Sequence, residues 1–362
     1  MRILLLLFCA FGMIPPAVAE PPTPPEARAW LEDWLTRPHA PPSISVAIAV
    51  GNQVVLAEAV GLADIDREIP ATPATTYRTY SISKGITAIA VMQLLERDRV
   101  ALDDELHKFV PGYPRKPWPI RIEHLLSHTS GIRHYKKNAG EISSTVEYAS
   151  LDDSLVVFKD DPLLFEPGTA KQYTTFGFNL LTGVIESASG VSYGDYLTAH
   201  LFEPAGMESS RLAVAGEDDG ALARAYWRPR KSRGKNKRIK KLPNVSGRYG
   251  ASGIVSTPTD LVRLFIALRA GEILREETFE RMISVPFPET DPDQTYGWNL
   301  DRKEGRFAVY RSGAGTGYTG ALIHYPEQNV TAALLVNQNQ YKERWELLEA
   351  LAGMYLDAGQ SP

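Results

Sequence analysis

Short apolar runs near both ends of the chain have the length and residue types of β-strands. Residues 43–50 and 53–60 are separated by Gly51-Asn52, a pair that favours a tight turn, so they predict a β-hairpin. Similar runs near the C-terminus predict four further strands, at 296–300, 306–312, 320–325 and 329–337. Strands are therefore expected from both ends of the sequence.

Between these runs, apolar residues recur with helical spacing. Helices are predicted at 82–97, 120–128, 177–189 and 193–202, with two more at 28–37 and 341–357. This order predicts a mixed α/β (α+β) fold, in which an antiparallel sheet built from both chain ends is flanked by helices and carries an inserted all-helical lobe. Residues 42–75 and 255–362 would form the sheet lobe, and residues 76–254 the helical lobe.

The first 19 residues have the pattern of a signal peptide. Arg2 precedes an apolar run from Ile3 to Ile14 that is too short to span a bilayer, and Ala17-Val18-Ala19 offers a cleavage site. Residues 20–41 are expected to form a proline-rich spacer and the first helix. Cleavage would also remove Cys9, the single cysteine, so we expect a periplasmic or secreted protein without disulfides.

Composition and charge exclude little. The 362 residues are 44% hydrophobic and 23% charged, as in soluble globular proteins, and a net charge of −4 gives no general attraction to nucleic acid. One segment departs from this balance, because residues 228–241 hold nine basic residues and no acidic one. This basic loop is either a solvated surface segment or a binding surface for an anionic partner, such as a lipid headgroup or a cell-wall polymer.

The predicted helix at 82–97 contains an unexpected charge. Lys84 stands three residues after Ser81, so the two side chains can meet on one face at the start of an otherwise apolar helix. A lysine that is partly removed from water loses proton affinity and can act as a base, which would activate the serine as a nucleophile. The simpler interpretation is a helix cap followed by a lysine whose ammonium reaches solvent.

Two later stretches favour the catalytic interpretation. Tyr173-Thr174-Thr175 follows a Pro167-Gly168 turn, and Arg311-Ser312-Gly313 lies on a predicted strand. Together with Ser81-Ile82-Ser83-Lys84 they resemble the three motifs of the serine β-lactamase and penicillin-binding-protein superfamily. The tyrosine in the second motif resembles the branch that holds class C β-lactamases, D-Ala-D-Ala carboxypeptidases and related esterases. The resemblance extends from about Pro42 to Leu335.

The resemblance implies a role for each matching residue. Ser81 would be the nucleophile that forms an acyl-enzyme, Lys84 would help to deprotonate it, and Tyr173 would carry a proton between nucleophile and leaving group. The backbone N–H groups of Ser81 and Ala314 would form the oxyanion hole. The resemblance implies no cofactor and no metal, and it assigns substrate binding to the remaining motif positions, Thr175, Arg311, Ser312 and Gly313.

Two positions depart from the pattern of this family. Thr175 stands where the tyrosine motif usually ends in asparagine, and a hydroxyl cannot both accept from a lysine and donate to a substrate amide as a side-chain amide can. Arg311 stands where lysine or histidine is usual. Arginine keeps the positive charge and can grip a carboxylate with two N–H groups, so a substrate carboxylate is expected here.

The sequence therefore predicts an exported serine hydrolase that acts on small esters, D-amino-acid peptides or β-lactams. The alternatives are a non-catalytic penicillin-binding-like sensor or cell-wall binding module, and a zinc hydrolase that uses His124 and His128. Residues 190–194 match the G-x-S-x-G elbow of other hydrolases, but a predicted helix precedes them where a strand is required, and Ser192 with Asp195 is typical of a helix cap. The partner would be a small-molecule or peptide substrate, and the oligomeric state stays open.

Overall fold

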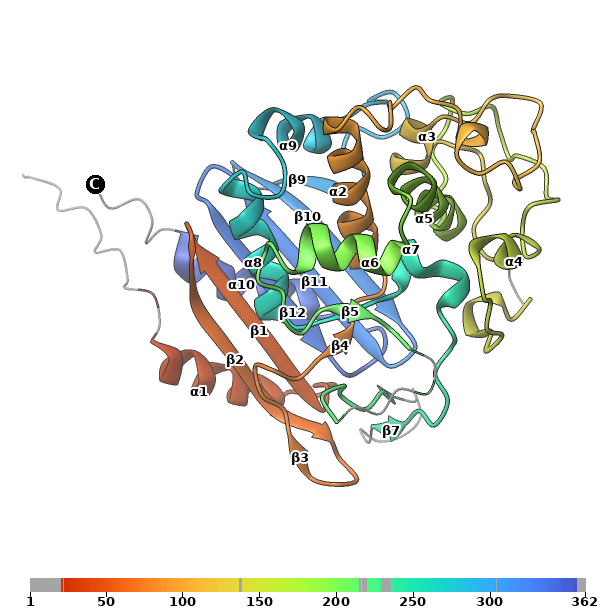
Figure 1. Cartoon of the computed structure of the whole chain (residues 1–362). Helices are drawn as coiled ribbons and strands as arrows, with labels where there is room; N and C mark the ends of the chain where they lie inside the picture. Colours follow the sequence, from red (N-terminus) through yellow and green to blue (C-terminus); the bar gives the residue numbers. More distant parts are fainter. Residues whose placement is uncertain are drawn as a thin grey trace, which may run out of the picture.

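The computed structural model describes residues 21–356 except for 22, 137–138, 215, 217–219, 229–235 and 304. Its centre is a seven-stranded antiparallel sheet with the order β3-β2-β1-β12-β11-β10-β9 (Figure 1). The strands of this sheet are β1 (Ser43–Val50), β2 (Gln53–Asp64), β3 (Ile69–Pro70), β9 (Asn299–Lys303), β10 (Arg306–Gly315), β11 (Tyr318–Tyr325) and β12 (Val330–Val336).

The two ends of the chain meet in the middle of this sheet. β1 pairs with β12 from Ile44 opposite Val336 to Val50 opposite Val330, and with β2 across the turn at Gly51. Gly51 has a φ of 59°, a left-handed conformation that glycine adopts without steric cost. The predicted hairpin and the predicted antiparallel sheet built from both chain ends are confirmed.

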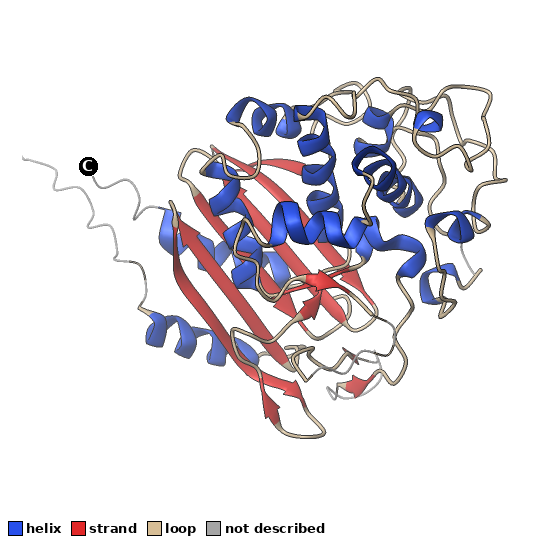
Figure 2. Ribbon diagram, viewed as in Figure 1, coloured by secondary structure: helices blue, strands red, loops and turns tan. Residues whose placement is uncertain are grey.

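Helices cover both faces of the sheet (Figure 2). Ile44, Val46 and Ile48 of β1 face the layer that contains α1 (Pro24–Leu35) and α10 (Arg344–Leu356). Ala47 and Ala49 face the opposite layer, which contains α2 (Ile82–Glu96) and α8 (Pro258–Arg269). Neighbouring residues of β1 thus alternate between two apolar layers, as the period of a strand requires.

In residues 76–254 the longer regular elements are helices, and loops connect them. Besides α2, this segment forms α3 (Ile122–Leu126), α4 (Leu151–Leu155), α5 (Thr175–Ser189), α6 (Tyr193–Leu197), which continues into a π-helical turn (Thr198–Phe202), and α7 (Tyr249–Ser252); α9 (Glu276–Ile283) follows α8. The segment also contributes short strands that the sequence did not indicate, because two or three residues carry no readable period: β4 (Tyr77–Arg78), β5 (Arg211–Leu212), β6 (Tyr226–Trp227), β7 (Lys237–Arg238) and β8 (Ile254–Ser256).

Helix α2 is the central element between the sheet and the other helices. Every residue from Ile82 to Leu94 is buried, so this helix is enclosed on all sides. A helix with apolar residues on every face is expected to be buried in this way. Gly85 lies directly against the indole of Trp298, where an added Cβ would come within 2.4 Å of the ring. This contact fixes the position of α2, and with it the residues at the start of the helix.

Two features of the sequence lie partly or wholly outside the described residues. They are the predicted signal peptide at 1–19 and most of the basic loop, of which the structure describes residue 228 and residues 236–241. In that described part, Arg238 pairs with Asp66 at 3.0 Å. No helix in the described part of the chain is long and apolar enough to cross a membrane.

The contact between Gly85 and Trp298 gives a prediction about stability. Gly85→Ala should lower the free energy of unfolding by about 1–3 kcal/mol, because the added methyl group overpacks a closed interface. Gly353→Ala is the matched control, since Gly353 lies in α10 with no atom within 4 Å of the added Cβ, and it should raise stability by up to about 1 kcal/mol. Urea unfolding of both variants measures the difference. Equal effects in the two variants would contradict the packing argument.

Candidate active site

Three side chains meet at the start of α2. Ser81 is the N-cap residue of this helix, and its half-buried hydroxyl lies 2.7 Å from the hydroxyl of Tyr173. The Nζ of Lys84 donates to the Ser81 Oγ at 3.1 Å. The structure therefore brings together the three residues that the resemblance marks as catalytic, from positions up to 92 residues apart.

Lys84 is fully buried and has no carboxylate partner among the residues that the structure describes. Its second hydrogen bond goes to the backbone carbonyl of Ala251 in α7, at 2.9 Å. Burial is the main cause that lowers the pKa of Lys84 to about 8; Tyr173 raises it, and the positive charge of Arg311 lowers it further. A minority of the lysine is therefore neutral near pH 7, and the neutral form is the one that can accept a proton.

Burial acts on Tyr173 in the opposite direction from its effect on Lys84. Burial by itself raises the pKa of this phenol, but the nearby charges of Lys84 and Arg311 outweigh that effect, and its pKa is lowered to about 8. The Lys84 Nζ lies 4.9 Å from the centroid of the Tyr173 ring. Because Lys84 and Tyr173 are this close, the two groups titrate as a pair rather than independently.

The loop before α5 holds Tyr173 in place through both of its neighbours. The amide of Gln172 donates to the His128 carbonyl at 2.9 Å, and the amide of Thr174 donates to the His128 Nδ1 at 3.3 Å. The His128 ring packs against the Tyr173 ring with centroids 4.5 Å apart. Burial holds the pKa of His128 well below its usual range, so this histidine is a neutral support for the tyrosine.

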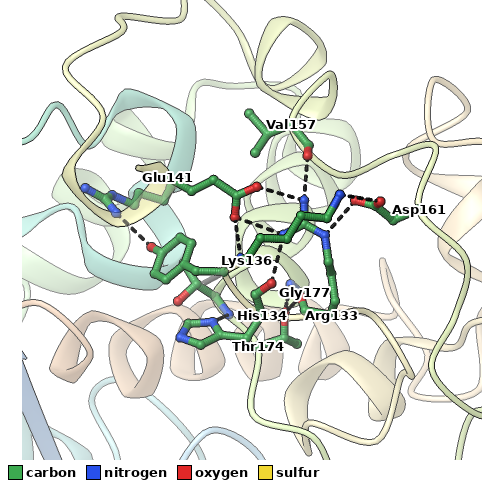
Figure 3. A network of polar contacts seen from close by, with 11 residues as sticks. Arg133, His134, Lys136, Glu141, Val157, Asp161, Thr174 and Gly177 are labelled. Carbon is green, nitrogen blue, oxygen red and sulfur yellow. Dashed lines mark hydrogen bonds and ion pairs between the residues drawn. The ribbon is translucent and has the colours of Figure 1, made fainter. Parts of the chain in front are cut away.

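A partly buried ion-pair cluster also anchors this loop (Figure 3). Arg133 contacts Glu141 at 3.0 Å and Asp161 at 2.6 Å, and it donates to the Val157 carbonyl at 2.7 Å. The backbone carbonyl of Arg133 accepts from the Thr174 hydroxyl at 2.7 Å, and that hydroxyl also caps α5. The cluster therefore fixes the loop that presents Tyr173.

The third motif lies on β10, against the start of α2. β10 pairs with β9 over residues 306–310, so within the described residues no strand pairs with residues 311–315 on that side. An added Cβ at Gly313 would lie 1.9 Å from the Thr79 carbonyl oxygen and 3.0 Å from the Ser81 nitrogen, so only glycine fits there. This close approach brings the edge of β10 to the Ser81 amide. An oxyanion hole that pairs this amide with that of Ala314 stays a prediction, as do the roles of Ser312 and Gly313 in substrate binding.

Arg311 is not placed as the sequence led us to expect. Its side chain is buried, with Nε donating to the Ser81 carbonyl at 3.1 Å and a terminal nitrogen donating to the Asn299 Oδ1 at 3.3 Å. The other terminal nitrogen is sealed from solvent, so the guanidinium offers no free pair of N–H groups for a substrate carboxylate. In this conformation Arg311 has no such pair to offer, and its bidentate grip on a substrate carboxylate stays a prediction. Arg311 instead supplies charge beside Tyr173, 5.8 Å from its ring.

Thr175 is the first residue of α5 and is nearly buried. Its backbone amide donates to the Nδ1 of His134 at 3.2 Å, and its hydroxyl has no hydrogen-bond partner among the described residues. No hydrogen bond joins Lys84 to Thr175 in the described part of the chain, because the Nζ of Lys84 donates to the Ser81 hydroxyl and the Ala251 carbonyl. The threonine at 175 therefore leaves Lys84 with two hydrogen-bond acceptors.

The other candidate residues have structural contacts. The Nδ1 of His124 accepts from the Arg121 amide at 3.1 Å and its ring packs on Phe287, while His128 supports Tyr173. Within the described residues, no group of three or more His, Cys, Asp or Glu side chains could hold a metal ion. Ser192 follows α5 and caps α6 by accepting from the Asp195 amide at 3.1 Å, as the sequence predicts, so it is not a nucleophile elbow.

Sequence reasoning missed several residues that complete the site. Ala251 acts through a backbone carbonyl, which no side-chain motif can reveal. His134 follows a run that resembles the family but belongs to none of the three motifs. Asn299 holds Arg311 from a neighbouring strand, and only the strand pairing brings the two together.

The fold is that of the serine β-lactamase-like class of hydrolases, and Ser81, Lys84 and Tyr173 are grouped as the resemblance predicts. The chain belongs to the Beta-lactamase family, whose model matches residues 31–353. The human mitochondrial serine beta-lactamase-like protein LACTB is 26% identical over 79% of this chain and 69% of its own length. Penicillin-binding protein 4* of Bacillus subtilis (strain 168) is 27% identical over 83% of this chain and 69% of its own length.

The relation extends to solved structures. The octameric penicillin-binding protein homologue from Pyrococcus abyssi superposes with a TM-score of 0.75 and 27% identity, covering 91% of this chain and 75% of that one. The penicillin-binding protein from Bacillus halodurans gives a TM-score of 0.73 with 25% identity, covering 87% of this chain and 94% of that one. The antiparallel sheet flanked by helices is therefore the fold of this family.

The geometry predicts how the two proton carriers depend on each other. Lys84→Ala and Tyr173→Phe should each lower kcat by roughly 10² or more, as the loss of a positioned proton-transfer group does. The double variant should lose less than the product of the two effects, because both residues serve one proton path. Steady-state kinetics on one activated ester measures all three variants. Fully multiplicative losses would show that the two residues act independently.

Proposed function

We propose that the protein hydrolyses acyl substrates through an ester on the Ser81 Oγ. The observation that carries this proposal is the position of that oxygen, 2.7 Å from the Tyr173 hydroxyl and 3.1 Å from the Nζ of a lysine with no carboxylate partner among the described residues. A nucleophile that contacts two groups with a lowered pKa has a nearby acceptor for its proton.

The reaction proceeds in two acyl transfers. In the first, the Lys84–Tyr173 pair takes the Ser81 proton as the oxygen attacks the substrate carbonyl, and the backbone amides beside β10 stabilise the oxyanion. The bond to the leaving group then breaks, and Tyr173 returns the proton to that group. In the second, a water molecule attacks the carbonyl of the Ser81 ester while the same pair takes a proton from the water. The pair then returns this proton to the Ser81 oxygen as the bond to the acyl group breaks and the carboxylic acid is released.

The proposed substrate class rests on Thr175 and Arg311, the two positions at which the site departs from the family pattern. Thr175 lacks the side-chain amide with which relatives hold a peptide or β-lactam, and Arg311 is engaged with Ser81 and Asn299 rather than free for a carboxylate. An ester has no N–H to satisfy and has a better leaving group. These features support small esters without a carboxylate as substrates, with D-amino-acid peptides and β-lactams as the second candidates, because two relatives are named as penicillin-binding proteins.

The place of action is part of the same proposal. Residues 1–19 have the charge, apolar length and small-residue site of a signal peptide, which supports export to the periplasm or the medium. The basic loop at 228–241 supports contact with an anionic surface there. The mass of the mature N-terminus, measured after expression with the full leader, tests the export step.

Labelling of Ser81 tests the proposed reaction. A fluorophosphonate should add one label to the wild type and none to Ser81→Ala, while Ser192→Ala, the matched control at a helix cap, should label fully. The wild type should continue to hydrolyse an ester after it has released one equivalent of product per enzyme molecule. A single burst that then stops would instead indicate the acylated sensor, and labelling that persists in Ser81→Ala would exclude Ser81 as the nucleophile.

Substrate preference gives a separate prediction. The value of kcat/KM for a p-nitrophenyl ester of a short acid should exceed that for a chromogenic cephalosporin, because neither Thr175 nor Arg311 offers the β-lactam its usual partners. Thr175→Asn should shift this ratio towards the cephalosporin by up to ~1–3 kcal/mol, the range for a buried polar group that gains a partner. A clear preference of the wild type for the cephalosporin would contradict this account of Thr175.

A further inference from the structure

A cavity of about 350 Å³ lies beside the described part of the basic loop, and none of Ser81, Lys84 and Tyr173 lines it. Among the described residues its lining includes no acidic side chain and five basic ones, Arg78, Arg224, Arg238, Lys240 and Lys241. Arg224 and Arg238 are each paired with an aspartate, at 3.4 and 3.0 Å. Arg78, Lys240 and Lys241 have no carboxylate partner in the part of the chain that the structure describes. The cavity therefore carries positive charge that the described residues do not balance.

Arg78 is a buried and fixed part of the cavity wall. It belongs to β4 and is 4% exposed, and one terminal nitrogen donates to the Pro243 carbonyl at 2.8 Å. Its Nε is sealed from solvent without a partner. The other terminal nitrogen makes no hydrogen bond among the described residues and is not sealed, so it stays open at the cavity that Arg78 lines. A buried cation with an open donor favours an anionic acceptor that comes from outside the protein.

Lys240 and Lys241 extend this positive charge to the rim of the cavity. Both are exposed and lie in the described part of the basic loop, shortly after β7. Arginine binds phosphate through N–H groups of fixed geometry, and lysine binds it as a point charge. A cavity with Arg78 in its wall and two lysines at its rim therefore suits a phosphate group that is attached to a larger body outside.

Exposed apolar side chains stand next to this cavity. Ile142 and Val146 are 57% and 56% exposed, and Thr145 from the same segment lines the cavity. The amide of Asn244 donates to the Ser144 carbonyl at 2.9 Å, which joins this segment to the loop after β7. Apolar side chains that project into water beside unbalanced cations are typical of a surface that lies on anionic lipid.

We propose that residues 142–146 and 240–244 form a docking surface for an anionic lipid bilayer. The phosphate of one headgroup enters the cavity and accepts hydrogen bonds from Arg78 and the two lysines, while Ile142 and Val146 insert among the lipids at the level of the headgroups. The inference rests on the proposed contact of the basic loop with an anionic surface, and it names that surface. None of these residues belongs to the reacting centre, so the enzyme should hydrolyse esters without a membrane.

Sedimentation with lipid vesicles tests the docking surface. At low salt the purified protein should bind vesicles of phosphatidylcholine mixed with phosphatidylglycerol, and it should bind vesicles of phosphatidylcholine alone about 10-fold more weakly or less. Lys240→Gln with Lys241→Gln should weaken binding to the mixed vesicles about 20-fold, because each basic residue near the surface strengthens binding roughly fivefold. Ile142→Ser with Val146→Ser should weaken it about 10-fold, because the apolar insertion is lost.

Matched controls separate this surface from general effects of charge and apolar area. Lys108→Gln with Arg115→Gln removes two positive charges from another exposed segment. Val191→Ser removes an exposed apolar side chain from the turn between α5 and α6. Each control should bind the mixed vesicles within about two-fold of the wild type, since charges beyond a Debye length are screened and Val191 lies outside the docking surface.

Several results would overturn the inference. They are equal binding of the wild type to both kinds of vesicle, binding to neither, and undiminished binding by either docking variant. Binding of inorganic phosphate without retention on the mixed vesicles would also overturn it, because the cavity would then serve a dissolved ligand. The proposed function is tested separately, since Ser81→Ala should bind the vesicles like the wild type and lose ester hydrolysis. If that variant kept ester hydrolysis, the proposed function alone would fail.

Discussion

The site depends on the burial of one ammonium group without a carboxylate to balance it. In the part of the chain that the structure describes, Lys84 has only the Ser81 hydroxyl and the Ala251 carbonyl as hydrogen-bond acceptors. An isolated buried charge is costly, and the protein reduces this cost by lowering the proton affinity of the lysine. The charge that remains, together with that of Arg311, lowers the pKa of Tyr173. Burial of one residue therefore prepares both proton carriers, and a carboxylate beside Lys84 would abolish the effect by holding the lysine protonated.

The architecture supplies this environment from parts of the chain that are far apart. Helix α2 is enclosed between the sheet and α5, so its first turn is sealed on the inner side and open only at Ser81. The glycine at 313 lets β10 approach Ser81 from the sheet, while the Arg133 cluster and His128 hold the tyrosine loop on the opposite side. Each contact positions a backbone segment rather than a reacting atom. This explains why a site with three central side chains requires nearly the whole fold.

Much of this arrangement can be predicted from sequence, because local patterns encode it. The Gly51-Asn52 turn, the strands at both ends and the enclosed helix at 82–96 follow from residue types and spacing, and the meeting of Ser81 and Lys84 follows from helical geometry. The remaining features depend on contacts between distant segments. The Ala251 carbonyl that accepts from Lys84, the two partners that engage Arg311, and the hydrogen bond from the Thr175 amide to His134 all require the tertiary structure. The burial of Arg311 could not be predicted for this reason, because the sequence shows the charge of a side chain but not which groups surround it.

The pH dependence of Ser81 acylation tests the central claim most directly. Below its first pKa the Lys84–Tyr173 pair holds both protons and cannot accept another from Ser81, and above that pKa it can. The second-order rate constant for fluorophosphonate labelling of the wild type should therefore rise about tenfold per pH unit in the acidic range and level off above an apparent pKa of about 8. A rate that is independent of pH, or that levels off near the ordinary pKa of histidine at about 6.5, would contradict the account, because the base would then be a group other than this pair.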